Sequence, residues 1–385
     1  MALRFLSAGE SHGRGYTVIV EGLPAGLPVS LELLSSELAR RRRGWGRGPR
    51  MALERDVIEV WSGLRDGLTT GAPLSICLDN TEWRSWRGAM DPHQVDQQAQ
   101  DKVVSCPRPG HADLPGRLKY GHLDMRNVLE RSSARATAGW TLAGTVARAL
   151  LIGLGIQVRG AVTSIGGVHL ADPSSDEEWA RAVRSNMGCP READESPLIN
   201  RIDSAKEEGY SLGGTFVVSI KDMPTGVGSY VEWDRRLDGR LAGALMSIPA
   251  IKGVSLGDGF DLADRPGIEA HDEIHLEGEA LIRRTNRAGG IEGGMTNGQE
   301  VMLRAAMKPI PTMKDSLPSV DLSTMEAHRA HVERCDVCAV PAACVVGEAM
   351  AAWVAASAIV EQFGGDRFED LSRRVQDHRS RISNG

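Results

Sequence analysis

The stretch from Pro341 to Phe363, PAACVVGEAMAAWVAASAIVEQF, predicts the helix around which the rest of the chain is arranged. It is rich in alanine, lacks a continuous polar face and is followed by two glycines, which commonly end helices. Its most apolar part, 341–360, is about as long as a membrane span. However, alanine dominates it and Glu348 lies near its middle. We therefore expect a helix buried inside the protein and no membrane segment.

A second stretch of small residues, from about Arg126 to Leu154, predicts another buried helix beside the first. Alternating or β-branched runs predict strands at 16–21, 57–61, 74–78, 156–165, 215–220 and 301–306. Because turns and loops separate several of these runs, antiparallel pairing is favoured over regular βαβ units. We expect the two helices to form the centre of the molecule.

Shorter helices are also indicated. Ser30 can cap a helix that ends in the arginine run 40–43, and a second pattern begins at Ser196-Pro197 and ends at Gly209. The second pattern lies within the polar segment 171–211. We interpret this segment as a peripheral helical excursion from the main body.

Bulk composition narrows the class of protein. The chain has 385 residues and a formal net charge of −6, which argues against a general nucleic-acid-binding protein. This length is compatible with two to three domains or one large domain, and no linker or internal repeat divides it. The first ten residues contain no apolar stretch of secretory length, so we expect a cytoplasmic location and free thiols.

One cluster has the residue types of a zinc site, namely His328, His331, Cys335 and Cys338. A single Cys-x-x-Cys without a second pair is a weak signal for zinc. We therefore predict no metal.

Three segments combine arginine with glycine or proline: 283–298 (RRTNRAGGIEGGMTNG), 40–50 (RRRRGWGRGPR) and 107–111 (PRPGH). A glycine-rich backbone can approach an anion closely, and arginine supplies planar, charged donors. Together these segments predict one site for a large anionic ligand set. Alternatively, the first arginines of 40–50 are simply cations favoured at a helix C-terminus.

Arg131 and Arg135 would share one face of the predicted second helix at i, i+4 spacing. Two buried guanidinium groups require anions, so either a ligand meets them or ion pairs with Glu130 or more distant acids do. The adjacent hydroxyls of Ser132 and Ser133 favour a phosphate.

The run from Gly9 to Gly13, GESHG, has the G-x-S-x-G spacing of a hydrolase nucleophile elbow. A strand-like run rather than a helix follows it, so a nucleophilic Ser11 is disfavoured. His12 in this run and His111 in 107–111 are candidate general acids. The alternative for each is a histidine that hydrogen-bonds a backbone carbonyl. Rossmann and P-loop motifs do not occur in the sequence.

Several motifs, in this order along the chain, closely resemble those of the chorismate synthase family. They are AGESHG at 8–13, RGPRM at 47–51, RPGHAD at 108–113, ERSSAR at 130–135, TNRAGGIEGGMTNG at 285–298, MKPIPT at 307–312 and DVCAVPAA at 336–343. The resemblance extends from about residue 3 to about residue 365. It implies conversion of 5-enolpyruvylshikimate 3-phosphate to chorismate and phosphate, with reduced FMN and no net redox change.

The resemblance also implies a fold and partners. The family fold is an α+β sandwich in which antiparallel sheets flank a helical core, as one domain spanning 1–385. Members are usually homotetramers that bind neither nucleic acid nor membrane. Whether NADPH or an external reductant supplies the reduced flavin is left open.

Site residues are carried over by position. His12, His111 and Asp336 would be catalytic: His111 would assist the departing phosphate, His12 would protonate the reduced flavin or its surroundings, and Asp336 would act in removal of the ring proton. The FMN site would comprise Arg131, Ser132, Ser133, Ala250, Gly294, Lys308, Pro309, Ile310, Pro311, Thr312 and Arg334. Substrate or NADP phosphates would be held by Arg41, Arg47, Arg50, Arg108 and Arg135.

Three positions depart from the family pattern: Pro249 in place of Asn or Gln, Ala136 in place of Glu, and Cys335 in place of Ser. The departures at Pro249 and Ala136 are the only support for a competing hypothesis, another flavin- or phosphate-handling enzyme on the same scaffold. A protein that binds anionic ligands or RNA through 40–50 is the alternative from a different class.

Overall fold

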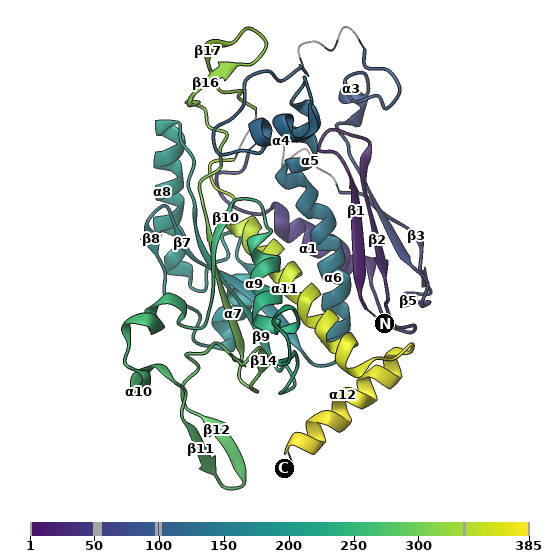
Figure 1. The fold of residues 1–385 in the computed structure, drawn as a ribbon, viewed down its shortest axis with the longest axis vertical. Helices are drawn as coiled ribbons and strands as arrows, with labels where there is room; N and C mark the ends of the chain where they lie inside the picture. The colour runs from purple at the N-terminus through teal and green to yellow at the C-terminus, as the bar shows by residue number, and fades with distance from the viewer. Residues whose placement is uncertain (1, 49–55, 97–98, 100–101, 334–335, 384–385) are drawn as a thin grey trace.

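The computed structural model describes residues 2–48, 56–96, 99, 102–333 and 336–383. Two antiparallel sheets enclose a layer of helices (Figure 1). The four-stranded sheet has the order β1-β2-β6-β3, formed by Arg4–Gly9, Gly15–Glu21, Leu74–Asp79 and Ile58–Ser62. The five-stranded sheet has the order β10-β15-β9-β7-β8, formed by Ile251–Leu256, Val301–Met307, Gly214–Lys221, Gln157–Ile165 and Val168–His169. The predicted α+β sandwich is confirmed.

The helical layer is built around α11 (Val340–Phe363), which ends at Gly364 as predicted. It packs on β7 and β9 of the larger sheet, while α6 (Thr137–Gly153) packs on β2 of the smaller sheet, and the two helices contact each other. A Cβ atom on Gly144 would lie 2.3 Å from the carbonyl oxygen of Ala349, so the helices meet backbone to backbone. Helix α11 has the length and hydropathy of a membrane span, but it is buried within the protein.

The prediction of one continuous helix from about Arg126 to Leu154 is wrong. It is divided into α5 (Arg126–Ser132), a 3-10 turn (134–136) and α6. The break lies at Ser133, whose ψ of 142° is extended and whose hydroxyl accepts a hydrogen bond from the backbone N–H of Arg135. Serine readily forms such local bonds in place of helical ones. Arg131 and Arg135 therefore do not share a helical face.

All six predicted strands are present, and each begins and ends within one residue of its predicted bounds. Three strands of the two main sheets were missed, β1, β8 and β10, as were the strands of the short hairpins. Strand β8 is only two residues long. Strand β1 is only partly buried, and β10 carries Lys252 and Gly253, so neither shows a clear apolar alternation.

The remaining elements are short hairpins and peripheral helices. The hairpins are β4–β5 (Leu64–Arg65, Leu68–Thr69), β11–β12 (Ile274–Glu277, Ala280–Arg283), β13–β14 (Ile291–Glu292, Met295–Thr296) and β16–β17 (Pro318–Asp321, Glu326–Arg329). The helices are α1 (Leu31–Arg42), α3 (Trp83–Trp86), α4 (Asp113–Tyr120), α7 (Asp176–Arg184), α8 (Glu195–Glu208), α9 (Leu237–Met246), α10 (Gly267–Ala270) and α12 (Phe368–Ser383). Ser30 caps α1 and Gly209 ends α8, as predicted. The segment 171–211 contains α7 and α8, and Trp179 anchors α7 on β7 and β9.

A buried ion cluster joins three helices of the central layer. Glu348 of α11 accepts hydrogen bonds from Arg40 of α1 at 2.7 and 2.9 Å and from Arg148 of α6 at 2.9 Å. Glu37 of α1 also pairs with both arginines, so two carboxylates balance two guanidinium groups. Burial by itself would raise the pKa of Glu348, but Arg40 and Arg148 overcome this and hold it below the usual range.

We predict that Glu348→Gln lowers the free energy of unfolding by about 3–5 kcal/mol, because it leaves buried Arg40 and partly buried Arg148 short of a counterion. Chemical denaturation of both proteins measures the difference. The folded pKa of Glu348 lies below its unfolded value of about 4.3. The effect is therefore fully present above that pH and shrinks as the pH falls toward the folded pKa.

Glu361→Gln is the matched control on the same helix. Glu361 pairs with Arg240 at 2.7 and 2.8 Å, but at an exposed end of α11. We expect a change of no more than about 1 kcal/mol there. Equal losses in the two variants would contradict a special role for the buried cluster.

Candidate functional site

A cavity of about 630 Å³ opens at one end of the helical layer. Its wall combines the junction between α5 and α6, the start of α11, the beginning of β10 and the loops at 108–112 and 308–312. This volume is within the range of small-molecule sites, about 300–1,000 Å³. Segments far apart in the sequence therefore contribute to one site.

Most of the predicted site residues lie on this wall. They are Arg41, Arg47, Arg108, His111, Arg131, Ser132, Ser133, Arg135, Ala250, Lys308, Ile310, Pro311, Thr312 and Asp336. His12, Pro309 and Gly294 do not line the cavity. Arg50 and Arg334 lie outside the described residues.

The wall is strongly basic. Its described residues include five arginines, Lys252 and Lys308, against the carboxylates of Glu333 and Asp336. Arg131 donates to the main-chain carbonyls of Ser7 and Gly9, and Lys308 donates to that of Gly110. Carbonyl oxygens satisfy these donors without cancelling their charge, so the cavity retains a positive field suited to anions.

Other arginines on the wall are paired with acids. Arg47 lies 2.9 Å from Asp336, and Arg135 lies 2.7 Å from the buried carboxylate of Asp56. The alternative reading of Arg135, an ion pair with a distant acid, therefore applies. The Nε atom of Arg47 is buried without a hydrogen-bond partner among the described residues. That donor is one for which the described residues supply no acceptor, and a ligand acceptor would satisfy it.

The arginines of 40–50 have two different roles. Some form contacts that stabilise the fold, and others line the cavity. Arg40 belongs to the buried ion cluster, Arg42 lies 3.4 Å from Asp56, and Arg43 donates to the carbonyl of Arg184. Among the described arginines of this run, only Arg41 and Arg47 line the cavity. Acids distant in sequence therefore pair with several arginines of this run.

The segment 283–298 does not reach the cavity, so the expectation that all three arginine and glycine segments meet there is wrong. Its glycines build turns around the β13–β14 hairpin, with Gly293 and Gly294 at positive φ. Arg283 is held within the segment by Glu292 and the carbonyl of Asn297. An acid inside the segment supplies the counterion that we had expected from a ligand.

His111 lies on the cavity wall beside Arg108. Its Nδ1 atom is 2.6 Å from Asp113, whose other contacts are to Arg108. Arg108 also donates to the hydroxyl of Thr312 at 3.1 Å. A guanidinium group and an imidazole are thus oriented together at one position of the wall.

His12 is buried behind the wall. Its Nδ1 atom is 2.7 Å from Glu130, and its ring stacks on Trp86 with centroids 3.9 Å apart. The neighbouring Ser11 is fully buried and accepts a hydrogen bond from the hydroxyl of Ser133. A strand-to-strand connection, not a strand-to-helix turn, carries Ser11, so the disfavoured nucleophile elbow is absent here.

Part of the wall is apolar. Trp140, Ile248, Ile310 and Val346 line it and could contact a flat ring. Next to them, Ala250 has φ of 69°, a left-handed conformation that is uncommon outside glycine. Its carbonyl accepts from the N–H of Lys308, which ties this strained turn to the 308–312 loop.

Besides the apolar lining residues, three charged contributors were missed from the sequence. Lys252 lies on the unpredicted strand β10, and Glu333 lies just before the predicted Arg334. Asp113 was part of a quoted motif but received no role. Among the described residues, no group of three His, Cys, Asp or Glu is placed to hold a metal ion, and Cys335 lies outside them.

Comparison with known proteins agrees with this architecture. A family model described as chorismate synthase matches residues 3–360. The chain belongs to the chorismate synthase family. Chorismate synthases from Desulforamulus reducens and Moorella thermoacetica are 52% and 51% identical, each covering 97% or more of both chains. A crystal structure of chorismate synthase superposes with a TM-score of 0.81 at 38% identity, covering 100% of this chain and 99% of the other.

Membership of the chorismate synthase family makes the chain an enzyme of the carbon–oxygen lyase class. It also confirms the resemblance on which the site residues were assigned. The individual roles of those residues remain predictions.

The strained turn at Ala250 yields a prediction about stability. Ala250→Gly should raise the free energy of unfolding by on the order of 1 kcal/mol, because glycine adopts positive φ without a Cβ clash. Ala250→Val should lower it, because a β-branched residue is poorly tolerated there. Thermal unfolding of both variants measures the effect, and the opposite order would show that φ at this position is not positive.

Proposed function

We propose that the chain converts 5-enolpyruvylshikimate 3-phosphate to chorismate and phosphate, with reduced FMN bound in the same cavity. The supporting observation is a cavity that combines seven basic side chains with an apolar wall in a member of the chorismate synthase family. The substrate carries a phosphate and two carboxylates, which would repel the flavin phosphate strongly in a low-dielectric pocket. The basic residues offset that repulsion.

The residues present fit a flavin. Arg131, Ser132 and Ser133 offer charged and hydroxyl donors, and the loop 308–312 adds Lys308 and Thr312. The apolar wall around Trp140 suits the ring system. When bound, reduced FMN would supply transient electron density that helps phosphate leave in the anti-1,4-elimination, with no net redox change.

Side chains of the protein would transfer the protons of the reaction. His111, oriented beside Arg108, would stabilise or protonate the departing phosphate. Asp336 would accept the ring proton, and its contacts to Arg47 and the backbone N–H of Gly48 position its carboxylate at the wall. Because His12 does not line the cavity, its proposed part is limited to protonating groups around the flavin.

The same proposal extends to the pathway, the cellular location, the oligomeric state and the partners. The reaction would be the last common step of the shikimate pathway to the aromatic amino acids, in the cytoplasm. The enzyme would act as a homotetramer, without nucleic-acid or membrane partners.

An anaerobic assay tests the reaction. The protein is mixed with 5-enolpyruvylshikimate 3-phosphate and a catalytic amount of chemically reduced FMN. Formation of chorismate is then followed by absorbance. We expect many turnovers per flavin. Flavin binding without chorismate would favour another enzyme on the same scaffold, and repetition with NADPH and oxidised FMN would show whether the protein reduces its own flavin.

We predict that His111→Ala lowers turnover by a factor of about 100 or more, because proton transfer from a positioned side chain contributes roughly that much. Flavin affinity and circular dichroism should be unchanged. The exposed His169→Ala, on β8 outside the cavity, serves as the control. A wild-type rate for His111→Ala would sink its role as an acid.

A further inference from the structure

Both histidines predicted to transfer protons are joined at Nδ1 to a carboxylate that is completely buried. The distance is 2.7 Å from His12 to Glu130 and 2.6 Å from His111 to Asp113, and both carboxylate side chains are 0% exposed. Neither carboxylate was assigned a role on the basis of family resemblance. Their shared placement on the same ring nitrogen suggests a shared purpose.

Asp113 acts only as an acceptor. Its Oδ2 atom accepts from the backbone N–H and Nε of Arg108, at 3.0 and 2.8 Å, and its Oδ1 atom accepts from Nη2 at 3.0 Å. Burial would raise the pKa of Asp113, but hydrogen bonds from His111 and Arg108 hold it well below the usual range. An ionised carboxylate has no proton to give, so Nδ1 of His111 must be the donor.

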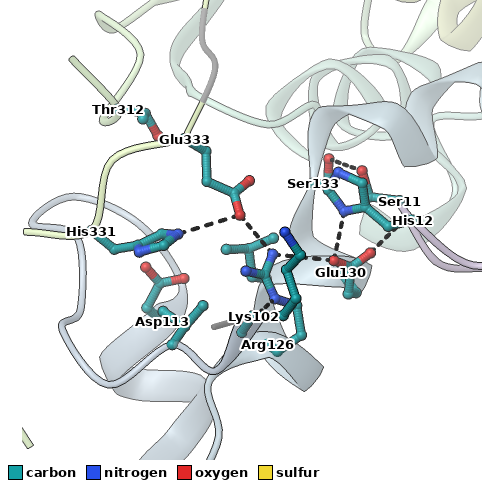
Figure 2. Close-up of polar contacts among 12 residues, drawn as sticks. Ser11, His12, Lys102, Asp113, Arg126, Glu130, Ser133, Thr312, His331 and Glu333 are labelled. Atoms are coloured by element: carbon teal, nitrogen blue, oxygen red, sulfur yellow. Dashed lines mark hydrogen bonds and ion pairs between the residues drawn. The ribbon is translucent and has the colours of Figure 1, made fainter. Parts of the chain in front are cut away.

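Glu130 meets His12 in the same way. Its Oε2 atom accepts from the backbone N–H of His12 at 2.6 Å, and its Oε1 atom faces both Nδ1 of His12 and Nη1 of Arg126, the latter at 3.4 Å (Figure 2). Arg126 continues to Glu333 on the cavity wall at 2.6 Å. Donors therefore face both oxygens of Glu130, which again makes Nδ1 the protonated nitrogen.

We propose that Glu130 and Asp113 are positioning residues that hold His12 and His111 in the Nδ1–H tautomer. In each ring, Nε2 is then the nitrogen that exchanges a proton with the reaction. The part that concerns catalysis rests on the proposed function, whereas the tautomer assignment does not depend on it.

Neighbouring groups fix the orientation of both histidine rings as well as the position of their protons. The backbone and ring of His12 bind the same carboxylate, and Trp86 covers one face of the ring. His111 is bound by a carboxylate two residues away, at the start of α4. Arg108 Nη2 lies 3.0 Å from Nδ1 and 3.4 Å from Nε2 of the ring, and with Nδ1 protonated only Nε2 can accept from it. Rotation of either ring would break a hydrogen bond to a buried carboxylate, which costs about 1–3 kcal/mol or more.

The direct test is nitrogen NMR of the enzyme labelled with ¹⁵N-histidine. Signals are assigned with His12→Gln and His111→Gln among the chain's ten histidines. We expect protonated Nδ1 and unprotonated Nε2 for the neutral form of both rings. Unprotonated Nδ1 with protonated Nε2 in either neutral ring would overturn the proposal for that residue, whether or not any variant folds.

Asp113→Asn and Glu130→Gln supply the functional test. The new amide can donate to Nδ1 and so admits the other tautomer. We expect the Nδ1 signal to change and kcat to fall about 100-fold or more. KM should change much less. A rise in KM alone for Asp113→Asn would show that Asp113 serves anion binding through Arg108, and would overturn its positioning role.

The exposed pair of His275 with Glu273 provides a matched control. Its Nε2 to Oε2 distance is 3.1 Å, but the Glu273 side chain is 72% exposed and lies outside the cavity. Glu273→Gln should leave kcat unchanged. If the wild type shows the expected tautomers but makes no chorismate, the proposed function fails while the assignment of Nδ1–H stands.

Discussion

Close contact between α6 and α11 is the constraint on which the rest of the structure depends. Gly144 allows the backbone of one helix to approach that of the other. Gly347 of α11 makes room for the Phe216 side chain of β9, and Gly160 of β7 makes room for the Cys344 and Glu348 side chains of α11. Larger side chains at these positions would force the layers apart, because close-packed interiors have little free space. The two sheets can therefore sandwich a thin helical layer, and the cavity forms where that layer ends.

The buried charges follow from the same geometry. Among helices packed so closely, Glu348 is almost completely buried and must find its partners inside the layer. Arg40 and Arg148 provide them, and Arg40 thereby fixes the last turn of α1. Arg41, the next residue, is consequently held at the cavity, where it donates to Thr137 at the start of α6. The structural core and the site are thus connected through one helix end.

Within the site, acids are as important as arginines. Asp113, Asp56 and Asp336 each orient an arginine on the wall, so only part of the positive charge faces a ligand without a carboxylate nearby. This arrangement fixes the directions of the guanidinium groups before any ligand arrives. Preorganised donors of this kind stabilise developing charge without having to reorganise during the reaction. The same acids account for why the arginine clusters are tolerated in the folded protein.

The sequence by itself determined the two small-residue helices, six strands, the caps at Ser30 and Gly209, and a set of motifs specific enough to predict the family. These features are local, because periodicity, capping and glycine placement act over a few residues. Only the tertiary structure decided which charges meet. Long-range contacts paired Arg135 with Asp56 and His12 with Glu130. The segment 283–298 lies away from the cavity. The second helix is broken at Ser133 by a local hydrogen bond that the pattern of small residues does not reveal. Electrostatic partners depend on distance in space, and one-dimensional spacing does not contain that information.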